Sequence, residues 1–152
     1  MKIKDAEKLA KELMNKHGLI GWSFKFDNAK MRLGYCFHYL YKGKISLSKP
    51  LTLLNNELLV RYAILHEIAH ALCPGEHHSK IWKAKCKQIG GDGCRYCGSD
   101  KAIIPKPKYK LVCKTCGMTY NRYRKPATKL SCNRCSKYFD TRYLLELKEI
   151  KC

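Results

Sequence analysis

The sequence predicts an α+β protein, with a small domain of mixed secondary structure at residues 1–90 and a cysteine-rich ribbon at residues 109–152. Helical and alternating apolar patterns are interleaved throughout the first part, which is typical of a packed α+β domain. Gly90 and Gly91 end the last helical pattern. Residues 91–108, with two prolines and little periodicity, form the expected connector. A chain of 152 residues with 45% hydrophobic residues has room for a packed core and an appended module.

The first half of the small domain predicts one helix and three strands. Apolar residues recur at helical spacing between Lys4 and His17, and Gly18 is placed to stop that helix. Alternating apolar and polar residues predict strands after it, and Lys42-Gly43 can form a turn between the second and the third. The expected strands are 22–26, 31–39 and 44–48, the last ended by Pro50.

Two further helices complete the small domain. Asn55 and Asn56 can cap a helix whose apolar residues continue to Leu72 and indicate a largely buried element. Cys73-Pro74-Gly75 ends that helix. A shorter amphipathic helix is expected at Ser79–Ile89, with apolar residues inward and four lysines outward.

The C-terminal part predicts two strands around a cysteine knuckle. Tyr109–Val112 and Met118–Tyr123 alternate on either side of a Cys-x2-Cys pair, and a second such pair follows after fifteen intervening residues. Residues 138–150 fit either a closing strand or a short helix.

Ten cysteines in a chain of this size indicate either disulfides or bound metal, depending on the compartment. The charged segment Met1–Lys8 lacks the apolar core of a secretory signal, and no apolar run approaches the ~20 residues that span a bilayer. We therefore expect an intracellular protein, in the cytoplasm or associated with a nucleoid or nucleus, that is not secreted and has no membrane partner. In that setting metal explains the cysteines better than disulfides do.

Six of the cysteines form three Cys-x2-Cys pairs, a spacing that lets two thiolates bind one tetrahedral zinc ion. Fifteen residues separate each pair from the next, so either two neighbouring pairs fit a zinc ribbon. The strand-like segments around the middle pair favour the last two pairs, and the expected ligands of a structural zinc are Cys113, Cys116, Cys132 and Cys135. The first pair, Cys94 and Cys97, can be spare thiols, a redox pair or half of another site.

Positive charge dominates the chain, with 31 Lys and Arg against 12 Asp and Glu and a net charge of +19. A field of this size favours polyanions, most often nucleic acid, over a purely solubilising surface or attraction to anionic lipid. Basic and aromatic residues between the last two cysteine pairs suit the phosphates and bases of DNA, with single strands preferred: Tyr120, Arg122, Tyr123, Arg124, Lys125 and Lys129. The alternative is a solvated ribbon face on which the tyrosines pack the hairpin.

His66 and His70 lie four residues apart in a predicted helix, so both imidazoles can bind one metal ion. Glu67 lies beside them and can accept a proton from a water that the metal activates, without being a ligand itself. Zinc in such a site also polarises a scissile carbonyl. The apolar flanks, the Pro-Gly stop and a second histidine pair soon after it weigh against an accidental arrangement. The pattern predicts a catalytic zinc site for peptide hydrolysis.

A catalytic zinc needs a third protein ligand, and Glu76, His77 and His78 are all within reach of the chain after this helix. Residues 64–91, with His-Glu-Ile-Ala-His-Ala-Leu and then His-Ser-Lys-Ile-Trp, resemble the core of the SprT-like (Spartan-type) family. The resemblance implies His78 as the third ligand, because the family's ligand lies four residues before an aromatic residue, here Trp82. The family usually has glycine after that ligand, where this chain has a serine.

The resemblance covers nearly the whole chain and implies a small zincin-like metalloprotease domain followed by a basic zinc ribbon. It also implies protein substrates on DNA, since SprT-like proteases are associated with the cleavage of DNA–protein crosslinks. Two zinc ions are expected, one catalytic and one structural. Two rival functions are a nucleic-acid-binding ribbon protein with a vestigial metal site, against which the intact Glu67 argues, and a metallopeptidase with a dedicated soluble substrate.

Overall fold

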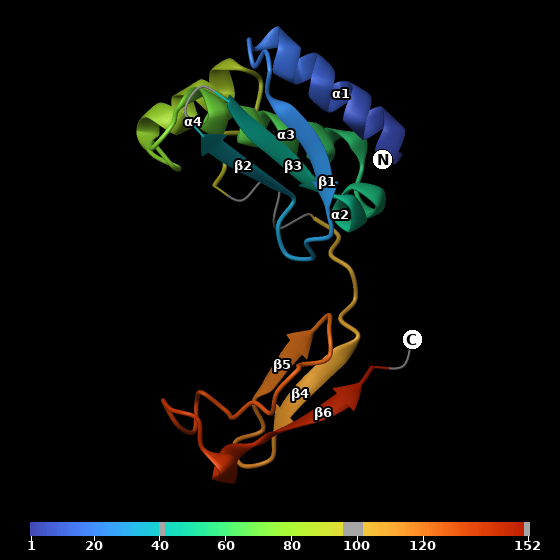
Figure 1. Cartoon of the computed structure of the whole chain (residues 1–152), viewed down its shortest axis with the longest axis vertical. Coiled ribbons are helices and arrows are strands. Elements are labelled where there is room, and N and C mark those ends of the chain that lie inside the picture. The colour runs from blue at the N-terminus through green and yellow to red at the C-terminus, as the bar shows by residue number, and fades with distance from the viewer. Residues whose placement is uncertain (40–41, 96–101, 151–152) are drawn as a thin grey trace. The chain divides into compact units, whose positions relative to one another are not determined.

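The computed structural model describes residues 1–39, 42–95 and 102–150. The chain divides into two compact units, Met1–Pro105 and Lys106–Cys152, and each combines strands with helical segments, in agreement with the α+β class expected from the sequence (Figure 1). The unit boundary falls inside the segment 91–108, so that Ala102 to Pro105 belong to the first unit. Within the described residues, no helix is both long and apolar enough to cross a membrane.

A three-stranded mixed sheet forms one layer of the first unit, with strands β1 (Ser23–Asp27), β2 (Gly34–Tyr39) and β3 (Lys42–Ser48) in the order β1-β3-β2. β3 pairs in parallel with β1 and antiparallel with β2, which leaves β2 at an edge. The prediction of a turn at Lys42-Gly43 is wrong. Both residues belong to β3, where they pair with Tyr39 and His38, because the strand pattern continues to the start of the segment.

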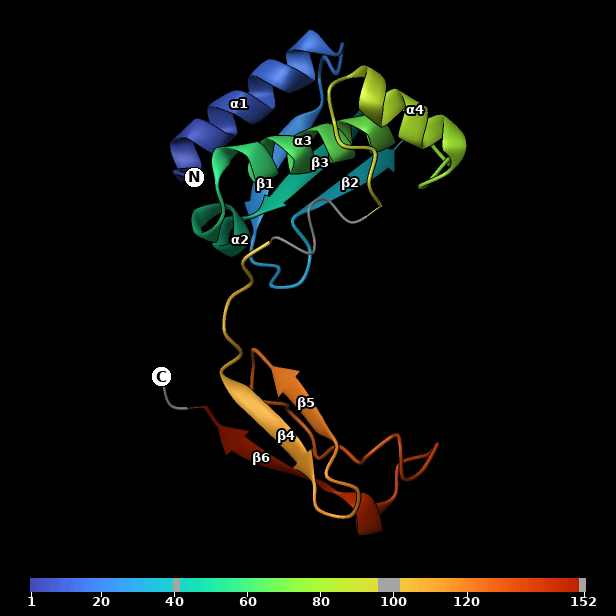
Figure 2. The same ribbon diagram turned by 180° about the vertical axis from the view of Figure 1, so that it is seen from behind.

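Helices α1 (Ile3–Lys16) and α3 (Glu57–Leu72) provide most of the helical layer, and α3 crosses one face of the sheet (Figure 2). Helix α4 (Lys80–Gln88) packs on the far side of α3. Because α3 has neighbours on several sides, it is buried around most of its circumference, as its nearly continuous apolar sequence indicates. Ile64 and Ile68 of α3 are fully buried together with Ile45 of β3, and they form the centre of the core.

One short helix, α2 (Lys49–Leu54), was not expected from the sequence. Pro50 does not simply end β3, because it occupies the first turn of this helix, where a missing N–H costs nothing. The Ser48 hydroxyl caps the helix by accepting a hydrogen bond from the Leu51 N–H at 3.1 Å. A serine two residues before a proline was the signal for it. The cap of α3 is Asn56, whose side chain accepts from the Leu59 N–H, whereas Asn55 has a different partner, described below.

The second unit is a small antiparallel sheet of β4 (Tyr109–Cys113), β5 (Thr119–Arg122) and β6 (Leu145–Glu149) in the order β5-β4-β6. β6 is preceded by the single 3-10 turn η1 (Thr141–Tyr143), so the C-terminal segment is a closing strand. Three residues of this unit's described part are buried, namely Leu111, Cys113 and Cys132. Two of the three are cysteines of the expected zinc site.

Candidate metal and catalytic sites

Helix α3 carries the first site in its C-terminal half. His66 and His70 lie one turn apart and present their imidazoles on one face, with Glu67 beside them. His66 and Glu67 are each only 7% exposed, because this part of α3 lies between the sheet and α4. The helix ends at Cys73, where the chain turns back toward the same face.

His78 reaches the two helical histidines from the loop between α3 and α4. The reversal uses left-handed backbone at Gly75 (φ 83°) and at His77 (φ 45°), a conformation that is uncommon for histidine. The Ser79 hydroxyl then caps α4 by accepting from the Trp82 N–H, and it donates to the Glu76 carboxylate at 2.6 Å. Of the three candidates for a third ligand, the structure thus brings His78 to the other two histidines.

The three Nε2 atoms converge, with separations of 3.1 Å (His66–His70), 3.2 Å (His70–His78) and 3.1 Å (His66–His78). Each neutral ring nitrogen is either a donor or an acceptor, so three mutually adjacent Nε2 atoms must include at least one pair of the same kind. Hydrogen bonds alone therefore cannot satisfy the group. Ligands around a tetrahedral zinc at the usual Zn–N distance lie about 3.3 Å apart, so these residues fit a shared zinc ion.

A buried tryptophan holds the three imidazoles in place. Trp82 of α4 is fully buried, and its ring centroid lies 4.6 Å from that of His66, 5.0 Å from that of His70 and 4.7 Å from that of His78. The ring stacks on His70 and meets the other two edge-on. The resemblance marked this residue only as the aromatic position of a motif, whereas the structure places it against every ligand of the group.

Burial sets the protonation of the site in the metal-free chain. It lowers the pKa of His66 to about 4 and that of His70 to about 3, so both rings are neutral near pH 7, the form that binds metal. Burial raises the pKa of Glu67 to about 8, while the charge of Arg32 acts in the opposite direction. In the metal-free chain this carboxyl is therefore mostly protonated near pH 7, and a bound cation would favour its ionised form, the one that accepts a proton.

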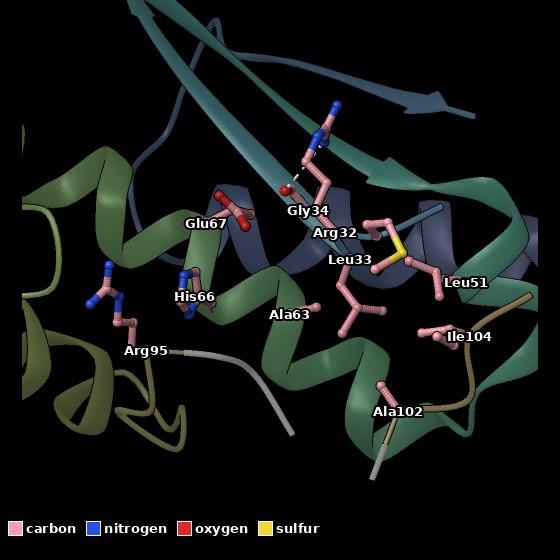
Figure 3. A pocket seen from close by; sticks show the side chains of 11 residues that line it. Arg32, Leu33, Gly34, Leu51, Ala63, His66, Glu67, Arg95, Ala102 and Ile104 are labelled. Carbon is pink, nitrogen blue, oxygen red and sulfur yellow. Dashed lines mark hydrogen bonds between the residues drawn. The ribbon is translucent and has the colours of Figure 1, made fainter. Parts of the chain in front are cut away.

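The carboxyl of Glu67 fits against a glycine of the sheet edge (Figure 3). A Cβ atom on Gly34 of β2 would lie 2.6 Å from Glu67 Oε1 and 2.7 Å from its Cγ, which is closer than carbon and oxygen atoms approach. Any larger residue at position 34 would therefore push Glu67 aside. Sequence reasoning missed this role, because only the packing of β2 on α3 reveals it.

Two cavities, each of about 450 Å³, open beside Glu67 and share Gly34, His66 and Glu67 in their walls. We call the first the histidine cavity; it contains the three converging imidazoles and is also lined by Cys36, His38, Cys73 and His77. We call the second the apolar cavity; its apolar lining consists of Met31, Leu33, Leu51, Ala63, Ala102 and Ile104. Glu67 thus lines both the histidine cavity and the apolar cavity.

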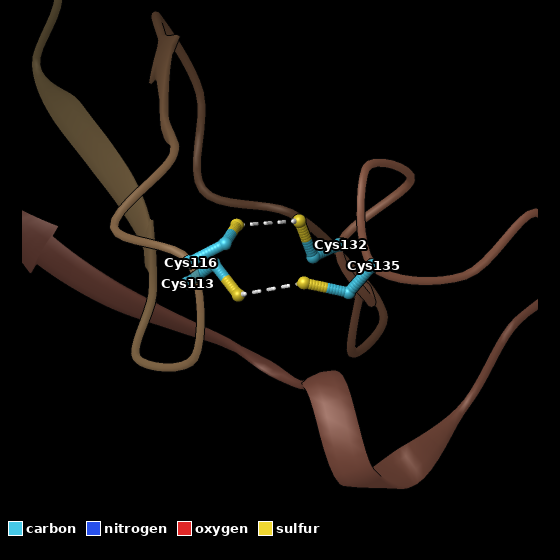
Figure 4. A group of neighbouring side chains, drawn as sticks. All are labelled: Cys113, Cys116, Cys132 and Cys135. Atoms are coloured by element: carbon cyan, nitrogen blue, oxygen red, sulfur yellow. Dashed lines mark hydrogen bonds between the residues drawn. The ribbon is translucent and has the colours of Figure 1, made fainter.

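The second site is a group of four cysteines in the second unit (Figure 4). The Sγ atoms of Cys113 and Cys135 are 3.8 Å apart, those of Cys116 and Cys132 are 3.6 Å apart, and all four lie within 4.8 Å of one another. Sulfur ligands around a tetrahedral zinc at the usual Zn–S distance lie about 3.8 Å apart. The donor set and its spacing fit one zinc ion in a closed, structural site.

Tyr120, expected to stack on nucleic acid, contacts this cysteine group. Its hydroxyl lies 2.6 Å from Asn133 Oδ1 and 3.4 Å from Cys132 Sγ. The contact with the tyrosine hydroxyl lowers the pKa of Cys132 to about 6, which favours the thiolate that binds metal. Tyr120 therefore has a structural role as a neighbour of the site in addition to any contact with a partner.

The other residues expected to contact nucleic acid lie on β5 and in the loop that follows it. Arg122 and Tyr123 are half-buried, whereas Arg124, Lys125 and Lys129 are exposed. Sequence reasoning overlooked a more exposed aromatic pair after the last knuckle, in which Tyr138 is 76% and Phe139 is 62% exposed. Two consecutive aromatic residues next to a lysine, in a unit with little core, were the signal for that pair.

Of the remaining cysteine pair, Cys94 is exposed and its N–H donates to the Asp92 carboxylate at 2.9 Å, while Cys97 lies outside the described residues. Among the cysteines that the structure describes, none forms a disulfide.

These features define an α+β protein with two groups of side chains that are able to hold a metal ion, one of three histidines beside a buried glutamate and one of four cysteines. The model of the SprT-like family matches residues 4–101, more than half of the chain, and the chain belongs to this family. A search of curated proteins found no match. The family is associated with metalloprotease-like activity, and both groups are compatible with zinc.

Proposed function

We propose that the chain is a zinc-dependent endopeptidase whose first unit is a zincin-like metalloprotease domain. The observation that carries the proposal is the convergence of three Nε2 atoms within 3.2 Å of one another beside a carboxyl that is 7% exposed. Three neutral imidazoles leave a tetrahedral ion one open position, which a catalytic site needs and a structural site does not. Membership of the SprT-like family supports the same activity.

In this proposal each residue of the site has one task. His66, His70 and His78 hold the metal, and Trp82 keeps their rings oriented. When bound, zinc supplies a Lewis acid that polarises the scissile carbonyl and acidifies water. Glu67 takes the proton of the attacking water and delivers it to the leaving amine. Gly34, which has no Cβ atom, leaves room for the Glu67 carboxyl beside the sheet.

Replacing Glu67 with glutamine tests the mechanism. Glu67→Gln keeps the shape of the side chain and removes the base, so zinc content should be unchanged while hydrolysis of an unfolded protein falls by at least about 100-fold. Zinc measured by mass spectrometry and cleavage followed on a gel report the two quantities separately. Wild-type turnover in Glu67→Gln would reject the assigned base, and absence of hydrolysis by the wild type would favour a nucleic-acid-binding protein with a vestigial site.

The charge of the second unit supports substrates on DNA, of the kind found in DNA–protein crosslinks. Residues 106–152 contain 13 Lys and Arg against 3 Asp and Glu. Exposed lysines and arginines can meet phosphates, and the exposed rings of Tyr138 and Phe139 can stack on unpaired bases beside them. In this part of the proposal the ribbon recruits the protease to DNA, with single strands preferred, and the peptidase cleaves what is bound there.

Salt dependence tests the recruitment. Neutralising Arg122, Arg124 and Lys125 together should weaken DNA binding and reduce the slope of log affinity against log salt by up to about 2 for single strands. Cleavage of a DNA-bound protein should fall in parallel, while hydrolysis of a short neutral peptide should not. The matched control neutralises three exposed lysines of α1, namely Lys4, Lys8 and Lys16. Equal effects of the two triple variants would mean that net charge, and not the ribbon, recruits DNA. Cleavage that is independent of DNA binding would favour a dedicated soluble substrate.

A further inference from the structure

The apolar cavity beside Glu67 is lined by apolar side chains that the metal site does not require. Its floor is made of Leu51 and Ala63, which are 1% and 2% exposed, together with the half-buried Leu33 (Figure 3). Its sides include Met31 and Ile104, which are 72% and 51% exposed. Large apolar side chains that stay this exposed around a buried apolar floor indicate a surface that a ligand covers.

One wall of this cavity comes from a segment distant in sequence, which a single side chain holds in place. The Asn55 side chain accepts from the Ile103 N–H at 2.8 Å and donates to the Ile103 carbonyl at 2.9 Å. Asn55 is 5% exposed, and it also donates to the Leu51 carbonyl at 2.8 Å, so both ends of its amide are used. Ala102 and Ile104, one residue to either side of Ile103, both line the cavity.

The position of the cavity points to a part of the substrate. Glu67 and His66 line the cavity on the side away from Ala102 and Ile104 (Figure 3), so a peptide bond held at Glu67 places the neighbouring substrate residues within a few ångströms of the cavity. The lining is mostly apolar, and a charged substrate side chain would lose its water there.

We propose that the apolar cavity is a substrate subsite that takes a large apolar side chain next to the scissile bond, and that Ala102 and Ile104, held by Asn55, form its outer wall. The inference rests on the proposed peptidase function. It means that the segment leading out of the first unit is part of the protease, and that changes there alter which sequences are cleaved. An apolar preference also directs cleavage to unfolded or locally opened proteins, because such side chains are normally buried.

Cleavage-site profiling of an unstructured peptide library by the full chain tests the subsite. The wild type should favour leucine, methionine and phenylalanine over serine by about tenfold or more at one position flanking the cleaved bond. Ile104→Ala should reduce that ratio several-fold, and Ala102→Phe, which fills the cavity, should shift the preference toward small side chains. The matched control is Leu53→Ala, since Leu53 is 54% exposed on α2 and does not line the cavity. A flat wild-type profile, or one that Ile104→Ala and Ala102→Phe leave unchanged, would overturn the proposal.

A binding measurement separates this inference from the peptidase proposal. Zinc-loaded Glu67→Gln, titrated calorimetrically with a neutral peptide carrying leucine and with its serine counterpart, should bind the leucine peptide about tenfold more tightly. Ile104→Ala in the same background should remove most of that difference. Selective binding without any hydrolysis by the wild type would reject the peptidase and leave the subsite as a peptide-binding site. Hydrolysis combined with equal binding of both peptides would reject the subsite and leave the peptidase.

Discussion

The two metal-binding groups differ in what holds their ligands together. His66 and His70 stand on a helix whose other side chains, such as Ile64 and Ile68, are fully buried in the core of the first unit. The four cysteines lie in a unit whose described part buries Leu111 and two of the cysteines themselves. Apolar burial therefore prepares the histidine site before any metal binds, whereas in the ribbon the metal has to supply the energy that a core would provide.

Removing all metal should therefore affect the two units very differently, and this is the largest effect that we expect. Without zinc the ribbon loses a contribution on the order of 10 kcal/mol and should unfold, because its buried apolar surface is too small to replace it. The first unit should stay folded. Amide hydrogen exchange of the chelated chain, resolved by peptide, measures both units at once. Persistent protection of β4 and β6, or simultaneous loss of protection in α3, would contradict the comparison.

Within the histidine site, the identity of the third ligand predicts the next largest effect. His78→Ala should release the zinc of this site and reduce hydrolysis by more than the ~100-fold typical of changes to outer-shell residues. His77→Ala should retain the zinc, because the His77 ring lines the histidine cavity without joining the three converging nitrogens. Zinc content and turnover of the two variants, measured side by side, provide the check. The opposite pattern would move the third ligand by one residue.

The close approach of Gly34 to Glu67 predicts a smaller and more selective effect. Gly34→Ala should retain zinc but lower kcat by about 10- to 100-fold, because the added Cβ displaces the carboxyl from its position. The control is Gly43→Ala on the adjacent strand, where a Cβ would meet the Trp22 ring at 2.3 Å and not Glu67. That variant should lose stability and keep its kcat per folded molecule. Equal kcat losses in both variants would show that the sheet, and not the position of Glu67, determines the rate.

Local patterns in the sequence were sufficient to predict most elements and the side chains that converge in the histidine and cysteine groups. Helical spacing located α1, α3 and α4 within one or two residues. Alternation located the strands before β6, although β2 begins at Gly34, three residues later than expected, and it left β6 open between a strand and a helix. The grouping of these side chains could be predicted because i, i+4 and Cys-x2-Cys spacings are themselves local geometry. His78 needed the family resemblance, since the loop after α3 offered Glu76, His77 and His78 equally.

The features that could not be predicted all depend on contacts between distant segments. The parallel pairing of β1 with β3 depends on how distant segments pack, which local patterns do not determine. This pairing places β2 at the edge of the sheet, beside Glu67. The close approach of Gly34 to Glu67 and the hydrogen bond from the Ile103 N–H to the Asn55 side chain form only when the chain is folded. Both asparagines before α3 fit a cap equally well in the sequence, but only Asn56 caps the helix, because Asn55 bonds a residue 48 positions away.

Zinc content and hydrolysis of a short neutral peptide, measured together in the wild type, His70→Ala and Cys113→Ser, test most directly the claim that one site is catalytic and the other structural. We expect two zinc ions and activity in the wild type. His70→Ala should keep one ion, held by the cysteines, and lose hydrolysis. Cys113→Ser should keep the other ion and hydrolyse the peptide, since the first unit has its own core. Hydrolysis that survives in His70→Ala, or disappears in Cys113→Ser while the histidine-bound ion remains, would contradict this division of roles.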